Sequence, residues 1–249
     1  MILHGEITAC KEYCMMHKCA ILQSNYIPWK GVFDMINQVD TFVFFEDVDF
    51  TKRDWRTRNQ IKTANGLLWL IVPVKKSPRG TKIFEINISQ IEDWQENHYQ
   101  NIVNAYKKSP YFHDYVSLLE KIYLKQKWVN LSEFNIYVTK LICEILGIKT
   151  KFINSKDLLT SGNKDDKLIE ICKNVGADFY LSGPAAKDYI NNQKFVDAKI
   201  QLAYINYNYP MYKQLYGEFN HYVTVLDLLL NCGEDSVNYI KNGNFELVK

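Results

Sequence analysis

The chain has 249 residues, of which 47% are hydrophobic and 23% are charged, and its formal net charge is +2. This composition is typical of a globular protein, and the length allows a large buried core in one large or two small domains. The near balance of basic and acidic residues excludes a general nucleic-acid coat, so no nucleic-acid partner is expected. No apolar run approaches the roughly 20 residues that cross a bilayer, so no membrane span is predicted.

The start of the chain carries no secretion signal. Residues 1–18 lack the charged start and apolar core of such a signal, so we expect a cytoplasmic protein with mostly reduced, buried cysteines. Cys10, Cys14 and His17 have a spacing that suits a metal ion, but Cys19 begins an apolar run. Without a fourth ligand we assign no metal site, and the sequence indicates no particular cofactor.

Two apolar runs near the start predict the fold class. Residues 19–22 and 41–45 are continuously apolar, which is typical of strands buried on both faces in a parallel sheet. Between them, apolar residues recur at helical spacing over residues 32–39. Strand, helix and strand form a right-handed βαβ unit, so we predict an α/β fold with a mostly parallel Rossmann-like sheet. Ligands bind such sheets at the carboxyl ends of the strands, where two loops begin.

The first of these loops, residues 23–30, leads into a helix. Pro28 restricts the backbone and Gly31 relaxes it, which allows a sharp turn, and a helix N-terminus favours an anion. The alternative is that Tyr26, Pro28 and Trp29 only pack as a rigid loop. The candidate binding residues here are Gln23, Asn25, Tyr26, Pro28 and Trp29.

The second loop, residues 46–59, is dense in charge. Asp47 and Asp49 follow the strand, and a cluster of cations, one tryptophan and one asparagine comes next. The members of this cluster are Lys52, Arg53, Trp55, Arg56, Arg58, Asn59 and Lys62. Arginine suits bidentate recognition of phosphate, and Trp55 can stack on a base or sugar. The cluster therefore predicts an anion site, whereas the alternative is a solvated loop whose charges pair with one another.

Several segments together carry a family resemblance. They are QSNYIPWKGVFDMIN, FEDVDFTKRDWRTRNQIKT, LWLIVPV, HYQNIVNAYKKSPYF, YLSGPAAKDYI and VTVLDLLLNCGED, between Ala20 and Gly233. This set resembles the WbqC-like family of bacterial proteins. The resemblance implies a product of gene clusters for O-antigen lipopolysaccharide and other surface polysaccharides. It also implies transfer of glycine or a related acyl group to a sugar.

A second similarity concerns only the segment from Tyr26 to Gly31. It resembles the loop of nucleotidylyltransferases that carries paired histidines, but Trp29 and Val32 stand where those histidines would fall. We use this similarity as an analogy for fold and ligand position.

The middle of the chain is predicted to be helical. Residues 75–80 form a turn-rich basic loop, either a mobile surface loop or one that closes over an anion, and residues 82–88 alternate like a strand. Helices are expected over 94–106, 112–123 and 131–146, with Gly147 as a C-cap. This pattern divides the chain into a βαβ part (1–90), a helical region (91–150) and a second α/β part (151–249), which we expect to complete one compact domain.

His98 lies on the first of these helices. Its unperturbed pKa near neutrality suits a general base, and the alternative is a structural histidine. The other four histidines have less claim to such a role.

The last part repeats the pattern of a strand followed by a glycine turn. A helix over 168–174 and a strand over 178–181 precede Ser182, Gly183 and Pro184, and a further helix contains Lys187. Ser182, Gly183 and Lys187 are thus a second candidate anion site, with Ser182 favoured as a helix cap over a nucleophile. Residues 201–205 predict a strand and 223–230 a buried helix, in which Asp227 needs a partner.

Three functions follow as hypotheses. The first is a transferase that modifies a nucleotide-linked amino sugar by forming an amide with glycine or a similar acyl group. The cations from Lys52 to Lys62 bind the diphosphate, Tyr26, Trp29 or Trp55 stack on a ring, and Asp47, Asp49 or His98 accepts a proton. Backbone N–H groups at Gly31 or Gly183 stabilise the oxyanion.

The second hypothesis is an ATP-dependent nucleotidyl or adenylyl transferase, with Asp47 and Asp49 as magnesium ligands. The third is a non-catalytic sugar-nucleotide-binding protein of the same pathway. The expected partners are a sugar nucleotide and a small acyl or amino-acid donor, and the sequence leaves an oligomer open.

Overall fold

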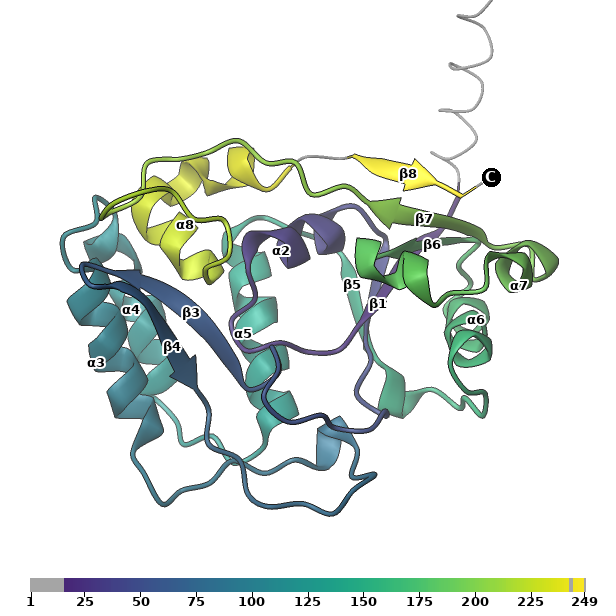
Figure 1. Ribbon diagram of the computed structural model, residues 1–249, viewed down its shortest axis with the longest axis horizontal. Coiled ribbons are helices and arrows are strands. Elements are labelled where there is room, and N and C mark those ends of the chain that lie inside the picture. The colour runs from purple at the N-terminus through teal and green to yellow at the C-terminus, as the bar shows by residue number, and fades with distance from the viewer. Residues whose placement is uncertain (1–15, 242–243, 249) are drawn as a thin grey trace, which may run out of the picture.

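A six-stranded sheet forms the centre of the protein. The computed structural model describes residues 16–241 and 244–248 (Figure 1). The strand order is β5-β2-β1-β6-β7-β8, in which the first five strands are parallel and β8 pairs antiparallel with β7. The strands are β1 (Lys18–Leu22), β2 (Thr41–Phe44), β5 (Lys151–Asn154), β6 (Phe179–Ser182), β7 (Gln201–Ile205) and β8 (Phe245–Leu247).

The order of the parallel strands is that of a Rossmann-like sheet. Along the chain the sheet grows outward from β1 to β2 and β5, and then returns to the other side of β1 with β6 and β7. The order reverses between β1 and β6, and ligands of such sheets bind outside the carboxyl ends of strands at this reversal. The predicted α/β class with a mostly parallel sheet is confirmed.

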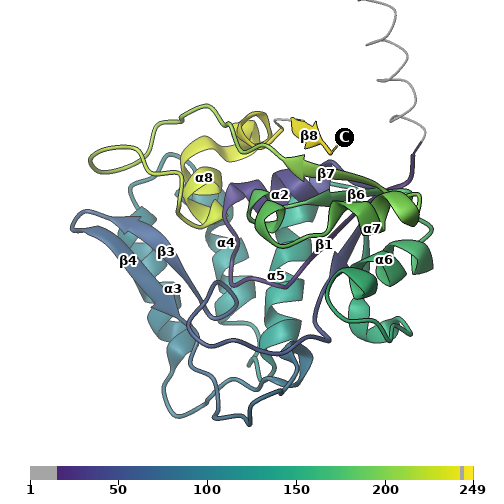
Figure 2. The same cartoon turned by 45° about the vertical axis from the view of Figure 1, so that its right-hand side comes forward.

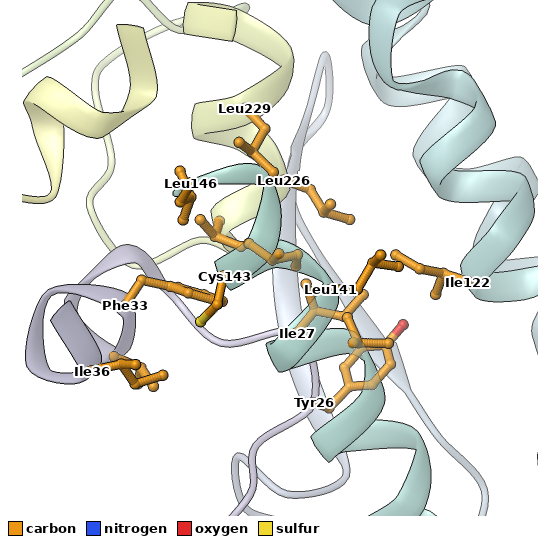
Figure 3. Close-up of a cluster of buried hydrophobic side chains, with 14 of the residues drawn as sticks. Tyr26, Ile27, Phe33, Ile36, Ile122, Leu141, Cys143, Leu146, Leu226 and Leu229 are labelled. Carbon is orange, nitrogen blue, oxygen red and sulfur yellow. The ribbon is translucent and has the colours of Figure 1, made fainter. Parts of the chain in front are cut away.

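Helices cover both faces of this sheet. Ala20, Phe42 and Leu181 pack on one face against α2 (Lys30–Asn37), α5 (Leu131–Ile145) and α8 (Val225–Cys232). On the opposite face Cys19, Ile21 and Tyr180 pack against α6 (Asp165–Asn174) and α7 (Asn192–Asp197). Successive residues of a strand point to opposite faces, so the continuously apolar runs follow from this three-layer arrangement. Figure 3 shows Tyr26 and Ile27 in the cluster between α2, α5 and α8.

The predicted helical region is present. It contains α3 (Trp94–Tyr106), α4 (Phe112–Tyr123) and α5, and Gly147 follows α5 with a φ of +66°. Side chains from all three predicted parts of the chain, such as Phe42, Phe134 and Leu228, belong to one hydrophobic core. Among the described residues, no helix is long and apolar enough to cross a membrane.

The strand expected over residues 82–88 is wrong. A short 3₁₀ helix, η1 (Ile83–Glu85), stands there, and only isolated bridges flank it, including Val74 with Ile88. Ile83, Ile86 and Ile88 are all buried, because this segment crosses the core as a loop beside α5. The apolar residues that predict a strand here are instead buried side chains of a loop.

A hairpin not predicted from the sequence forms a second sheet. Strand β3 (Arg58–Thr63) pairs antiparallel with β4 (Gly66–Ile71) through a two-residue turn. The polar sequence of β3 carries no strand signal and predicts a loop that includes Asn59. Ile61 and Leu70 point into the core, and α3 packs behind the hairpin (Figures 1 and 2).

The C-terminal part contains short 3₁₀ helices. Those are η2 (Ser155–Asp157), η3 (Pro184–Asp188) and η4 (Gly233–Tyr239). Pro184 occupies the first turn of η3, as expected, but the cap predicted at Ser182 is wrong. Gly183 is the N-cap residue, and the Ser182 hydroxyl is 3.4 Å from the Tyr180 hydroxyl. The predicted strand over 201–205 is confirmed.

Candidate functional site: an aromatic pocket beside the β1–α2 loop

The loop after β1 contains a strained residue. Ile27 has a φ of +34°, a left-handed conformation that is costly for a β-branched side chain. The neighbouring hairpin segment holds the loop in place. The amide of Tyr26 donates to the Trp55 carbonyl (2.8 Å), and Nδ2 of Asn59 donates to the Ile27 carbonyl (2.8 Å). Tyr26 and Ile27 lie in the core, whereas their neighbours Asn25 and Trp29 are partly exposed.

Those neighbours line a pocket of about 420 Å³. Its walls come from the β1–α2 loop, the segment before β3, and the long loop of residues 206–224 after β7. Five aromatic rings and three carboxamides dominate the lining. The lining residues are Asn25, Pro28, Trp29, Trp55, Asn59, Tyr207, Asn208, Tyr209, His221 and Tyr222. None of them carries a permanent charge.

Trp29 is the central ring of this pocket. Its ring lies 4.8 Å from that of Tyr207 and 5.9 Å from that of Tyr209, both nearly edge-on, and 6.1 Å from that of Tyr222. The indole covers Gly31 so closely that a Cβ there would meet it at 2.3 Å. The expected role of Gly31 is therefore corrected: its φ is not positive, and glycine makes room for the Trp29 ring.

Buried carboxylates tie down the loop of residues 206–224. The Tyr209 hydroxyl donates to Asp34 (2.7 Å), and the Tyr212 hydroxyl donates to Asp227 (2.8 Å). Asp227 also accepts from the Tyr106 hydroxyl (3.0 Å) and from Gln214 (2.8 Å), which supplies the partners that its burial requires. Half of the pocket lining comes from this loop. Its run of tyrosines was the available signal, but nothing in the sequence linked it to the β1–α2 loop.

Lys30 lies beneath the same loop, in a cage of aromatic rings. Its Nζ is 5.0 Å from the ring centres of Tyr209 and Tyr212 and 5.7 Å from that of Phe219. The Pro210 carbonyl accepts a long hydrogen bond of 3.4 Å from Nζ. No carboxylate of the described residues pairs with it, and burial lowers the pKa of Lys30 to about 8. A cation here, at the first residue of a helix, opposes the helix dipole as well.

His221 is the imidazole of the pocket lining. Burial, and then the charge of Lys30, lower its pKa, so the imidazole is neutral at pH 7. Its ring packs edge-on against Phe219 at 4.5 Å. Its Nδ1 is buried and has no hydrogen-bond partner among the described residues. A neutral imidazole in a pocket wall can accept a proton.

The structure brings together five of the predicted site residues in this pocket. Asn25, Pro28 and Trp29 come from the first loop, and Trp55 and Asn59 come from the predicted cationic cluster. Asn59 is occupied in positioning, because its side chain bonds both the β1–α2 loop and the Gln60 amide.

Tyr26 and His98 lie in the core behind the pocket. The Tyr26 hydroxyl is 2.7 Å from Nδ1 of His98 and 2.5 Å from the Tyr123 hydroxyl. His98 also bonds the backbone of Ile71, and burial lowers the pKa of His98 to about 4. This chain of hydrogen bonds joins the β1–α2 loop to α3, α4 and β4, so the structure gives both residues a positioning role.

The predicted cations are dispersed, and none lines the pocket. Lys52 and Arg53 are exposed, and Arg58 stacks 4.6 Å above the ring of Trp69. Arg56 is buried and bonds Gln23, Thr51 and Asp54. Lys62 bonds Gln214 and the carbonyl of Glu218. The predicted single cluster is therefore divided between the surface and the interior.

The predicted acidic residues have partners of their own. Asp47 accepts from Ser155 (2.5 Å) and pairs with Lys167 (2.6 Å), whereas Asp49 pairs with Lys82 at the surface (2.8 Å). Neither lines the pocket.

The second candidate site, at Ser182, Gly183 and Lys187, also lies outside the lining. Lys187 pairs with Glu246 (2.5 Å) on the antiparallel strand β8. The metal-ligand spacing at Cys10 and Cys14 lies outside the described residues. Within the described residues, no three metal-ligating side chains come together.

Fold and site together define an α/β protein of Rossmann-like strand order with an uncharged aromatic pocket beside its first strand. The chain belongs to the WbqC-like protein family, whose sequence profile matches residues 23–239. All of the lining residues fall within this range. The chain is 38% identical over 227 residues to the uncharacterized protein Rv1507c of Mycobacterium tuberculosis. The aligned region covers 91% of this chain and 98% of that protein. No solved structure matches the chain.

Proposed function

We propose that the protein is a transferase that binds the sugar ring of a nucleotide-linked amino sugar in the aromatic pocket and forms an amide on its amine. The observation that carries the proposal is the lining, which combines five aromatic rings with the carboxamides of Asn25 and Asn208, while the carboxamide of Asn59 holds the loop in place. The negative faces of aromatic rings attract the C–H faces of a sugar, and carboxamides both donate to and accept from its hydroxyls. A few polar groups in a largely apolar pocket are typical of small-molecule sites.

The position of the cations supports a nucleotide that extends out of the pocket. The lining is uncharged, whereas Lys52 and Arg53, three and two residues from Trp55, are exposed and form no ion pair with a described residue. They are available for a diphosphate at the rim. Arg56 supports this arrangement from within, since it fixes the loop that carries them.

His221 is the base that the geometry favours. The amine attacks the acyl carbonyl carbon, the C–N bond forms as the bond to the leaving group breaks, and the proton on nitrogen passes to His221. This step needs a neutral base in the pocket, and His221 is a lining residue with a lowered pKa. His98, Asp47 and Asp49 lie outside the lining and are bonded elsewhere.

A ligand screen by thermal unfolding tests the binding step. An amino-sugar nucleotide at 100 times its Kd adds about 2.7 kcal/mol to the free energy of unfolding, while the nucleoside diphosphate alone adds less. Trp29→Ala removes the effect, and Ile91→Ser, at an exposed site away from the pocket, keeps it. Stabilisation by ATP with magnesium alone contradicts the proposal and favours a nucleotidyl transferase.

A turnover assay tests the chemical step. The protein is incubated with the amino-sugar nucleotide and glycine with ATP, an acyl-coenzyme A or an aminoacyl carrier, and the products are followed by mass spectrometry. His221→Gln lowers kcat by about 10² to 10⁴ with little change in binding. Binding without turnover by any donor contradicts catalysis and favours the non-catalytic sugar-nucleotide-binding protein. The paired state of Asp47 and Asp49 is the observation that favours this second function over metal-dependent nucleotidyl transfer.

A further inference from the structure

The hairpin of β3 and β4 presents an unusual apolar surface. Leu67, Trp69 and Ile71 alternate along β4 on the side away from the core and are 42%, 38% and 54% exposed. Trp55, 52% exposed, extends this surface, since its ring lies 5.8 Å from that of Trp69. We call these four residues the apolar hairpin face. Contiguous exposed apolar surface of this kind marks an interaction site.

The outer edge of β4 is also free. In the register of the hairpin, Leu67, Trp69 and Ile71 point their backbone N–H and C=O groups away from β3. The backbone of Ile71 bonds His98, but those of Leu67 and Trp69 bond no described residue. Natural edge strands are protected by charges, prolines or bulges, and β4 has none of these. Figure 2 shows β4 at the margin of the molecule.

Three cations that form no ion pair with a described residue adjoin this face. Lys52 and Arg53 precede Trp55, and Arg58 stacks on Trp69. Of the acids near the hairpin, Asp54 pairs with Arg56 and Asp49 with Lys82. Glu218, whose carbonyl accepts from Lys62, is an exposed acid against these three cations.

We propose that the apolar hairpin face docks the protein on an anionic lipid membrane. Exposed tryptophan and leucine side chains beside lysine and arginine are the combination that binds at the interface of such membranes. Charge complementarity favours a lipid surface over a second copy of the chain, because a copy brings the same cations to the contact. Trp55 belongs to both the hairpin face and the pocket, so docking turns the pocket opening toward the lipid surface.

Vesicle sedimentation of the full chain tests the proposal. The vesicles contain phosphatidylglycerol and phosphatidylethanolamine, and matched vesicles contain only phosphatidylcholine. The wild type binds the anionic vesicles and releases them at high salt. W69S with I71S weakens binding at least tenfold. The matched control, I91S with L159S, removes two apolar side chains that are 94% and 98% exposed elsewhere, and it binds as the wild type does.

Two results overturn the proposal. One is that the wild type, shown to be folded by thermal unfolding, binds anionic and neutral vesicles equally or binds neither. The other is a dimer in light scattering that W69S with I71S converts to a monomer, which assigns the face to a second copy. Circular dichroism shows whether the variants fold. If the double variant does not fold, the milder variant I71T replaces it in the vesicle assay. The outcome is independent of the ligand screen above.

Discussion

At the scale of single residues, two residues beside the pocket depart from ordinary folding rules. Ile27 is left-handed, and Lys30 is buried without a carboxylate partner at a helix N-terminus. Proteins tolerate such departures mainly where function requires them. Lys30 directly follows Trp29 and Ile27 precedes it by two residues, which supports the assignment of this region as the functional site.

Gly31→Ala tests the arrangement of the Trp29 ring. The added methyl meets the indole at 2.3 Å, so the ring must move, at a cost of about 1–3 kcal/mol of stability and with loss of sugar-nucleotide binding. Gly183→Ala is the matched control, because no neighbouring atom lies within 4 Å of its added Cβ and its φ is −75°. Equal effects of the two substitutions on binding, measured by calorimetry, contradict the account of Gly31.

His98 predicts a pH dependence of stability. Its pKa is lowered from 6.5 to about 4 in the folded protein, so between these values the unfolded chain binds the proton more strongly. Stability is therefore complete above pH 6.5 and falls by about 3 kcal/mol as the pH drops to 4. Urea unfolding of the wild type and His98→Gln measures this, and the expected difference between them shrinks at low pH. Parallel pH profiles contradict the burial of a neutral imidazole.

Lys30 predicts the opposite limb of the pH profile. Its pKa is lowered from 10.5 to about 8, so the folded state loses the proton first as the pH rises. Stability attributable to Lys30 then increases from pH 8 toward pH 10.5. Lys30→Met removes this rise. At pH 7 the variant gains stability because no charge is buried, and it loses about 2 kcal/mol of cation–π contacts. We expect the gain to be the larger of the two, so the melting temperature at pH 7 rises. An unchanged slope between pH 8 and 9.5 in the variant contradicts a buried amine.

At the scale of elements, the pocket depends on a loop fixed from below. Residues 206–224 have no helix or strand, and loops of such length are usually functional. Asp227→Ala removes the shared acceptor of Tyr106, Tyr212 and Gln214, and we expect a loss of about 3 kcal/mol. Limited proteolysis within 206–224 should accelerate in this variant. The exposed Asp188→Ala is the control, and equal proteolysis of the two variants contradicts the anchoring role.

The elements also show what sequence patterns can and cannot predict. The sequence predicts three elements at the bounds that the structure shows: the helices over 94–106 and 112–123 and the strand over 201–205. Their apolar residues recur at regular spacing because each element packs against the core. Residues 82–88 resemble a strand in sequence because Ile83, Ile86 and Ile88 are buried, but the segment is a loop with one short 3₁₀ helix. Strand β3 is polar along most of its length, and its pairing partner rather than its own sequence makes it a strand.

At the scale of the whole molecule, local sequence predicted one wall of the proposed pocket and missed another. The β1–α2 loop and Trp55 were identified because a buried strand or dense side chains precede them. Tyr207, Tyr209 and His221 were not, because they reach the pocket only through the return of the chain after β7. The cations from Lys52 to Lys62 are close together in the sequence but do not form one cluster in the structure. Arg56 and Lys62 are buried, whereas Lys52 and Arg53 are exposed.

The crystal structure of the protein with an amino-sugar nucleotide tests the central claim most directly. We predict that the sugar ring lies in the pocket against Trp29, with its hydroxyls bonded to Asn25 or Asn208 and its amine near His221. The diphosphate should extend toward Lys52 and Arg53. A sugar bound outside the pocket, for example beside Gly183 at the carboxyl ends of β1 and β6, contradicts the account.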